Sequence, residues 1–485
     1  MRNKVLLAAA LVALMAAPAF AAVQNVKVSG DIDSTYISRN HFGLGQQTSP
    51  GGVEDVGLVK QSVFVTQARV RIDADLSDNV STTVGLINER GWAAETAAGV
   101  AAQNTDVQLY LAYATLREFL YSPLTVSVGR QVFSYGNGLV IGDGGPNNIA
   151  TGNLGTIAAD LTKRTTYDGI KAVLDYKPLT LDLIYFKNDQ NFLTGAPDAV
   201  KTSSDVWGLN ANYQLGDAMN SIVEGYFFAR QTGDRSTTVG PNFVALGPAN
   251  KGDQLYVPGL RVSTNPIKGL NLQAEAAWQF GRIARTTLAG VPVNGDNARR
   301  SAMAFQLMGS YTLPVLEKYK PTVNASFTHV SGDKNRTDHR TVSASPASRT
   351  VYTAWDPFNE SQNGGTIYNS IFNLTNLNIF SLGGSVTPVE DVTATLTWTG
   401  LWADRRWHST ANPLVLVQPD GSASGTLATT SRKEMGSEYD LNVNYAYTED
   451  VTLGVSLGWF IPGRTFDGNN DTKATQALAH VLVNF

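Results

Sequence analysis

The 485-residue sequence has no cysteine, only five histidines, and charged residues at 16% of its length. Without cysteine, the chain can form neither a disulfide framework nor a thiolate metal site. The formal net charge is −4, which gives no reason to expect nucleic acid as a partner. Beyond the N-terminal segment no run of 18 apolar residues occurs, so the sequence argues against a protein that crosses a membrane with helices.

The N-terminal segment is typical of a cleaved export signal. Arg2 and Lys4 precede the apolar run 5–15, which is too short to span a membrane. The tripeptide AFA at 19–21 matches a small-residue cleavage site. We therefore predict a signal peptide over 1–21 and one exported domain over 22–485.

Alternation of apolar and polar residues is the main structural signal. In the stretch QARVRIDADL (67–76), apolar Val70, Ile72, Ala74 and Leu76 alternate with charged Arg69, Arg71, Asp73 and Asp75. The same period of two recurs over 26–39, 270–280, 392–400 and 438–447. These segments have the length of tilted membrane strands, whereas strands of soluble proteins are usually about 5–6 residues long. The pattern favours a transmembrane β-barrel over a soluble β-sandwich or β-helix.

Eighteen such strands can be placed along the chain. We predict them near 26–39, 61–76, 79–90, 106–117, 123–133, 164–177, 179–188, 204–215, 220–231, 256–265, 269–282, 299–313, 320–332, 375–388, 391–404, 434–448, 451–461 and 474–485. Short joins alternate with long ones, and the long ones are 40–60, 134–163, 232–255, 333–374 and 405–433. This asymmetry is typical of an antiparallel up-and-down barrel with short periplasmic turns and long external loops.

The polar face of these strands is expected to line a water-filled lumen. A Lys or Arg that faced lipid would cost roughly 2–4 kcal/mol at the membrane midplane, and a one-residue slip would turn every charge outward. The charged residues expected to line the lumen are Arg69, Arg71, Lys171, Arg230, Arg261, Asp73, Asp75, Glu224 and Glu275. By alternation alone Arg130 shares the lipid-facing side of Val128, unless a bulge at Gly129 turns it inward.

Strand direction orders these charges by height. Arg69, Arg71, Lys171, Arg261 and Glu275 fall near the middle, and Arg39 and Arg230 fall toward the outer mouth. The aspartates fall toward the periplasmic end. Rings of basic side chains favour anions, which predicts an anion-selective constriction above an acidic vestibule. The alternative is that arginines and aspartates on facing strands pair and neutralise each other.

The last residue is an aromatic that closes an alternating strand. The chain ends ALAHVLVNF, with Phe485 in register with Val481 and Val483. This ending is like the signal by which outer-membrane barrels are recognised for assembly, so we expect the barrel assembly machinery as a partner.

Two long motifs give a resemblance to a known family. VGRQVFSYGNGLVIGD (128–143) and GSEYDLNVNYAYTEDVTLGVSLGWFIPG (436–463), with weaker matches at NER (88–90) and YDGIKAVLDY (167–176), resemble the alginate export family of outer-membrane β-barrels. The resemblance implies an eighteen-stranded, monomeric barrel whose arginine-rich, anion-selective lumen passes an acidic polyuronate outward. It also implies that Arg130 lies in the lumen and that Glu438 and Asp440 belong to a late-strand motif of the family, while loop position adds Arg164 to the expected lining.

These observations predict a non-enzymatic outer-membrane channel for anionic solutes, with alginate or another acidic polysaccharide as the candidate cargo. The first alternative is a general or nutrient-uptake porin of mixed selectivity. The second alternative is a barrel lipase or protease, with His339 and His480 as its candidate bases. Without catalysis, His339 is explained as a residue of a solvated loop and His480 as a residue of the lumen wall. The sequence predicts no cofactor and no metal site, and outer-membrane lipid surrounds the expected barrel.

Overall fold

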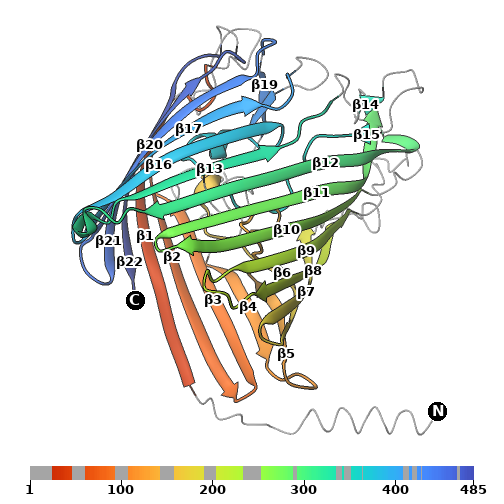
Figure 1. The fold of residues 1–485 in the computed structure, drawn as a ribbon, viewed down its shortest axis with the longest axis vertical. Helices are drawn as coiled ribbons and strands as arrows, with labels where there is room; N and C mark the ends of the chain where they lie inside the picture. Colours follow the sequence, from red (N-terminus) through yellow and green to blue (C-terminus); the bar gives the residue numbers. More distant parts are fainter. Residues whose placement is uncertain are drawn as a thin grey trace.

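A computed structural model describes residues 25–45, 60–92, 107–142, 158–189, 204–232, 253–287, 292–334, 341–342, 351–362, 364–407, 414–417, 423–427, 429–466 and 470–485. Eighteen antiparallel strands close into one barrel, which confirms the predicted fold class (Figure 1). The predicted signal peptide and His339 lie outside the described residues. No helix in the described ranges is long and apolar enough to cross a membrane.

Each barrel strand pairs with its neighbours along the chain. The barrel strands are β1 (Asn25–Asn40), β2 (Lys60–Ser77), β3 (Val80–Gly91), β4 (Gln108–Leu116), β5 (Leu124–Gln131), β6 (Tyr167–Asp175), β7 (Leu179–Asp189), β8 (Ser204–Gln214), β9 (Ile222–Thr232), β10 (Gln254–Ile267), β11 (Leu270–Thr287), β12 (Pro292–Thr312), β13 (Thr322–Val330), β16 (Leu377–Val389), β17 (Val392–Ala403), β20 (Glu434–Ala446), β21 (Val451–Pro462) and β22 (Ala474–Asn484). Four shorter strands lie in the long connections: β14 (Thr341–Val342), β15 (Val351–Tyr352), β18 (Leu414–Val417) and β19 (Ala423–Leu427).

The alternation of residue types decides which way each strand faces. On β1 the outward Val26 and Val28 are more than half exposed, whereas the inward Asp31 is buried. The same alternation continues around the wall, and large apolar side chains such as Leu183 and Leu260 are exposed on the outside. An apolar outer face and a polar inner face are the arrangement that a lipid surround and a wet lumen require.

The first and last strands close the barrel. β1 pairs with β22 over Asp31–Asn484 to Asn40–Thr475, and Figure 1 shows the two strands (red and dark blue) side by side. Phe485 extends this ladder, because its backbone exchanges hydrogen bonds of 2.8 and 3.0 Å with Gly30. The Phe485 ring lies over Gly30, where a Cβ atom would approach the ring to 2.6 Å and the Arg69 carbonyl oxygen to 2.4 Å.

One rim has short turns and the other has the long connections, as predicted. Residues 78–79, 268–269 and 390–391 are the shortest turns. The longest described turn on that rim, 313–321, contains the 3-10 helix η3 (Glu317–Tyr319).

The long connections 134–163 and 333–374, however, are not simply external. Their described parts run into the barrel, and they form three inner segments: 132–142, 158–163 and 351–376. A parallel bridge joins Ile141 to Asn359, and the Ser361 amide donates a hydrogen bond of 2.8 Å to the Gly138 carbonyl. Apolar side chains of these segments pack against the inner wall, for example Phe133 against Phe186 at 4.7 Å between ring centroids.

Replacing Gly30 with Val tests the closure of the barrel. Because the new side chain would collide with backbone at Arg69 and with the Phe485 ring, we expect a loss of about 1–3 kcal/mol of stability. The measurement is the temperature at which the folded band is lost in heat-modifiability gels. Gly225→Val is the matched control, because nothing lies within 4 Å of a Cβ atom at Gly225. Equal melting of both variants would contradict the closure role of this contact.

Candidate functional site

The inner surface of the barrel carries most of the predicted site residues. Strand register and the burial of their neighbours place these residues on the inward side: Arg69, Arg71, Asp73, Asp75, Lys171, Glu224, Arg230, Arg261, Glu275, Glu438 and Asp440. They fall into two groups with different contacts. One group holds the inner segments, and the other stays accessible to the lumen.

Glu224 and Glu275 hold the first inner segment, 132–142. The Glu275 carboxylate accepts hydrogen bonds from the Asn137 amide at 2.6 Å and from the Tyr226 hydroxyl at 2.7 Å. Glu224 accepts one from the Gly136 amide at 3.0 Å. Both carboxylates are buried, so they act as anchors for the segment rather than as free charges of the lumen.

The turn of this segment depends on glycine. Gly136 adopts a φ of 61° and Gly138 a φ of 72°, a region that favours glycine. A Cβ atom at Gly136 would also lie 2.6 Å from the Glu275 carboxylate. The motif SYGNG at 134–138 therefore allows the backbone to approach its anchor closely.

Arg261 joins this anchor to the wall. Its guanidinium donates to the Asn137 side chain at 2.6 Å and to Gln273 at 3.1 Å, and it pairs with Glu224 at 3.2 Å. Only about one sixth of the Arg261 side chain is exposed. Arg261 is thus mainly a structural group of the first inner segment.

Glu438 and Asp440 hold the third inner segment, 351–376. The Glu438 carboxylate accepts hydrogen bonds from the backbone amides of Thr366, Ile367 and Tyr368 at 2.6–2.8 Å. It thereby satisfies the free amides at the start of the one-turn helix α3 (Tyr368–Ile371). Asp440 accepts from the Thr366 hydroxyl at 2.6 Å. The late-strand motif therefore serves to position this segment.

Arginine–aspartate pairs fix the remaining parts of the inner segments. Asp356 contacts Arg230 at 3.0 Å and Arg300 at 2.6 Å. Asp160 of the short 3-10 helix η2 (Ala159–Leu161) forms a two-bond pair with Arg39, in which both side chains are almost fully buried. Removing one partner of a buried pair leaves an uncompensated charge, so these pairs lock the segments in place.

The accessible cations lie together on the wall of β1 and β2. The side chain of Arg71 is 43% exposed and that of Arg69 is 33% exposed. Lys163 of the second inner segment, 158–163, reaches the same wall and contacts Asp31 at 3.1 Å and Asp33 at 2.9 Å. Arg69 also contacts Asp31 at 2.7 Å. The result is a basic cluster, Arg69, Arg71 and Lys163, with acids interleaved.

Arg71 makes a two-bond contact with Asp73 two residues along the strand, at 2.8 and 2.9 Å. Pairs this exposed to water contribute about 0–1 kcal/mol to stability. The pairing therefore reduces the positive field at the wall without removing it. The pairing across strands that the sequence left open occurs instead between Arg69 and the facing Asp31, whereas the Arg71–Asp73 contact lies along one strand.

A second wall, from β11 to β21, has no charge at its described inward strand positions below the anchors. Inward positions on the short-turn side of β11–β13, β16, β17, β20 and β21 carry hydroxyl and amide groups: Asn271, Gln273, Ser310, Asn324, Ser326, Ser381, Ser385, Thr395, Thr397, Asn442, Asn444 and Ser456. The described lumen is thus laterally asymmetric. One side is charged, and the other offers neutral hydrogen-bonding groups.

The expectation that Arg130 lies in the lumen is wrong by register. Arg130 pairs with Asp168 on β6, on the same side of the sheet as Val128 and Ile170, which are both exposed. Gly129 has a φ of 129°, but the ladder continues without a shift, so the distortion does not turn Arg130 inward. Its guanidinium forms an ion pair with Asp168 at 2.6 Å.

Arg164, which loop position added to the expected lining, directly follows the second inner segment. It is half-buried there, and burial lowers the pKa of its guanidinium while the Glu89 carboxylate opposes this fall. Sequence reasoning missed Lys163, Asp160, Asp356 and Arg300. The first three lie in connections that read as external loops. Arg300 adjoins Arg299 in a strand, and only register separates the inward arginine from the outward one.

Glu360 is a buried carboxyl of the third inner segment. Its side chain is 1% exposed, and its Oε1 atom accepts no hydrogen bond from the described residues. Burial, with a smaller contribution from the charge of Asp356, raises the pKa of Glu360 to about 7, whereas Arg230 opposes this rise. The carboxyl is therefore neutral in acid and becomes a buried charge above neutral pH.

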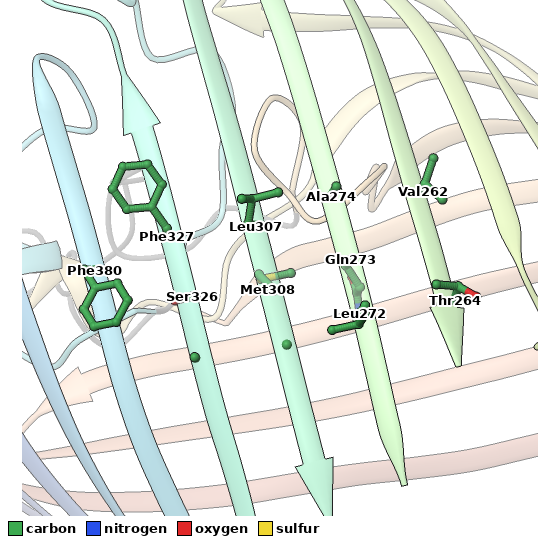
Figure 2. Close-up of a pocket in the computed structure, with 12 residues that line it drawn as sticks. Val262, Thr264, Leu272, Gln273, Ala274, Leu307, Met308, Ser326, Phe327 and Phe380 are labelled. Atoms are coloured by element: carbon green, nitrogen blue, oxygen red, sulfur yellow. The ribbon is translucent and has the colours of Figure 1, made fainter. Parts of the chain in front are cut away.

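The outer surface carries a separate apolar groove of about 480 Å³. Outward side chains of β10–β13 and β16 line it, and Figure 2 shows Leu307, Phe327 and Phe380 along its wall. Its lining is almost entirely apolar and lipid-facing, so it is no site for a polar solute. Within the described residues, no group of three or more His, Asp and Glu side chains could hold a metal ion.

A sequence model of a family described as alginate export matches residues 35–480. No curated protein matches the chain. The predicted resemblance is thereby confirmed at the level of the family.

Solved structures with the same fold are outer-membrane proteins. The outer membrane protein opdK from Pseudomonas aeruginosa has a TM-score of 0.54 at 10% identity, with 96% of this chain and 99% of that chain covered. OccAB1 from Acinetobacter baumannii has a TM-score of 0.52 at 11% identity, with coverages of 96% and 97%. OccK2 (OpdF) from Pseudomonas aeruginosa in complex with glucuronate has a TM-score of 0.52 at 13% identity, with coverages of 96% and 99%. At these identities the likeness concerns the fold alone.

Replacing Glu438 with Ala tests the anchor of the third inner segment. Each buried amide that loses its acceptor costs roughly 1–3 kcal/mol, so the segment should open and close more often. We expect larger and noisier single-channel currents in planar bilayers. Glu434→Ala is the matched control on the same strand, since Glu434 pairs only with the exposed Arg464. Unchanged current noise in the Glu438 variant would rule out the anchor.

Glu360 predicts a pH dependence of the same segment. Because its folded pKa of about 7 lies above the usual value of 4.5, the packed state binds a proton that the open state releases. The packing therefore weakens as pH rises from about 4.5 to 7, by roughly 1.4 kcal/mol per pH unit. We expect current fluctuations to increase between pH 5 and pH 8, and Glu360→Gln to abolish the increase. The same increase in the Gln variant would assign the effect to another group.

Proposed function

Because the chain belongs to the alginate export family and shares the barrel fold of outer-membrane porins, we propose that it is an outer-membrane channel that passes anionic solutes. The observation that carries the proposal is the basic cluster of Arg69, Arg71 and Lys163. The side chains of its two arginines face the lumen and are 33% and 43% exposed. Basic groups at a narrow part of a pore favour anions.

The chemistry of the two walls supports an acidic sugar as the cargo. Guanidinium groups bind carboxylates in a two-bond geometry, which suits the basic wall. The hydroxyl and amide groups on the wall from β11 to β21 can form hydrogen bonds with the hydroxyl groups of a sugar. We therefore propose a uronic-acid oligomer or polymer such as alginate, exported outward, as the candidate cargo. The similar barrel OccK2 was solved in complex with glucuronate, which is consistent with this chemistry in such a fold.

A general or nutrient-uptake porin of mixed selectivity is the second candidate. The observation that favours it is the set of acids beside the cations: Asp31 contacts both Arg69 and Lys163, and Asp73 contacts Arg71. Asp75 of β2 adds negative charge on the same wall. Such a wall would attract anions only weakly.

The family and the fold favour a channel over an enzyme. Within the proposal, the barrel acts as a monomer in outer-membrane lipid, and the barrel assembly machinery recognises the terminal strand with Phe485. His480, the remaining candidate base, faces inward on β22 beside Gly454 and Asn444. Among the described residues, no acid or serine is a partner of His480 at that position.

The reversal potential of the purified barrel under a KCl gradient tests the proposal. We expect anion selectivity in the wild type and at least a twofold fall in the chloride-to-potassium permeability ratio for Arg69→Gln with Arg71→Gln, because both cations face the lumen. Arg464→Gln is the control, since that arginine is exposed beyond the end of β21.

Polyuronate added on the periplasmic side should block the wild-type current, and the double variant should need a higher concentration. Cation selectivity without block would favour the porin of mixed selectivity. Block that is equal in the wild type and the double variant would place the recognition away from the basic cluster.

A further inference from the structure

Two outward-facing arginines stand directly opposite each other on the lipid side of β11 and β12. The register pairs Arg282 with Arg299, and both side chains are exposed. Arg300, the neighbour of Arg299, points the other way and is held by Asp253 inside the barrel. The outward pair is therefore distinct from the arginines that anchor the inner segments.

The height of this pair follows from the strand below it. The outward residues of β11 are apolar from Leu270 to Phe280, and Trp278 and Phe280 form its upper end. About 9–11 residues of a tilted strand cross the hydrocarbon core, with aromatic residues at its edges. Arg282 is the next outward residue. It lies on the rim of the long connections, which places the pair at the headgroup level of the external leaflet.

Nothing in the register neutralises the two charges. The cross-strand neighbours of Arg282 are Gln254 and Arg299, and Arg299 has Val351 on its other side. Like charges directly opposite each other on a sheet are destabilising, so an anion between them would be favoured. Guanidinium groups bind phosphate oxygens in two-bond geometry.

On another part of the same rim, the outward cations have acidic partners. Toward β5–β8, the outward cations stand opposite acids: Arg130 pairs with Asp168, and Lys187 pairs with Asp205. These cations already have an internal counter-charge. The contrast singles out β11 and β12 as the part of the described rim where arginine opposes arginine.

We propose that Arg282 and Arg299 bind the phosphate group of a lipid in the external leaflet, with Gln254 as a further hydrogen-bond donor. The occupant is a membrane phospholipid or phosphoglycolipid, because the aromatic girdle directly below the pair faces its acyl chains. This site lies on the outside of the barrel and is separate from the lumen. It depends on the outer-membrane location but not on the identity of the cargo.

Lipid A, a glycolipid with two phosphates, is the probe for this site. The purified barrel in neutral detergent is titrated with lipid A, and native mass spectrometry counts the bound lipid. We expect Arg282→Gln with Arg299→Gln to raise the apparent Kd at least fivefold. Lys187→Gln with Asp205→Asn is the matched control, because it removes an ion pair from the same rim without changing the net charge.

Two further ligands test whether the site requires both the phosphate group and the lipid. Dephosphorylated lipid A should bind the wild type no better than the double variant does, and inorganic phosphate at the lipid concentration should not displace lipid A. Equal affinity of wild type and double variant would overturn the proposal, and so would displacement by free phosphate. Heat-modifiability and single-channel conductance show that each variant is folded, so a failed lipid site remains distinguishable from a failed channel assignment.

Discussion

A charge on the lipid-facing side of a barrel strand costs roughly 2–4 kcal/mol at the midplane, and the rest of this structure depends on that constraint. Because side chains alternate along a strand, the cost applies to all residues of one parity together. Arg69, Arg71, Asp73 and Asp75 can therefore face only the lumen, and a one-residue slip of β2 against β1 is excluded. The outward charges that do occur, such as Arg130 and Arg282, lie near the ends of their strands on the rim of the long connections.

The same inward charges also hold the inner segments in place. Inner segments that enter the barrel bring backbone amides away from water, and each amide needs an acceptor. Glu275 and Glu438 supply acceptors from the wall, and the pairs Arg39–Asp160 and Arg230–Asp356 fix the segments from the side. Much of the lumen charge is thus used to hold the inner segments, and a smaller part, the basic cluster of Arg69, Arg71 and Lys163, stays accessible to the lumen.

Most of the fold could be predicted from the sequence because its signal is local. A strand with one apolar and one charged face needs no knowledge of its partners, so all eighteen barrel strands were placed near their observed positions. The functional site could be predicted less completely from the sequence. Parity identified Arg69 and Arg261 as inward, but it could not tell that one stays accessible while the other binds Asn137 and Glu224. Arg130 shows the opposite case, in which the plain alternation was right and the expectation from the family resemblance was wrong.

The sequence by itself determined the barrel, its strand number, the side on which each charge lies and the closing role of the terminal strand, because these follow from alternation and from the cost of charge in lipid. Only the tertiary structure decided that the described parts of 134–163 and 333–374 enter the lumen and which carboxylates receive them. The physical reason is that such contacts join residues far apart in the chain. Asp160 pairs with Arg39 across a separation of 121 residues, and Glu438 accepts a hydrogen bond from the amide of Ile367 across 71 residues.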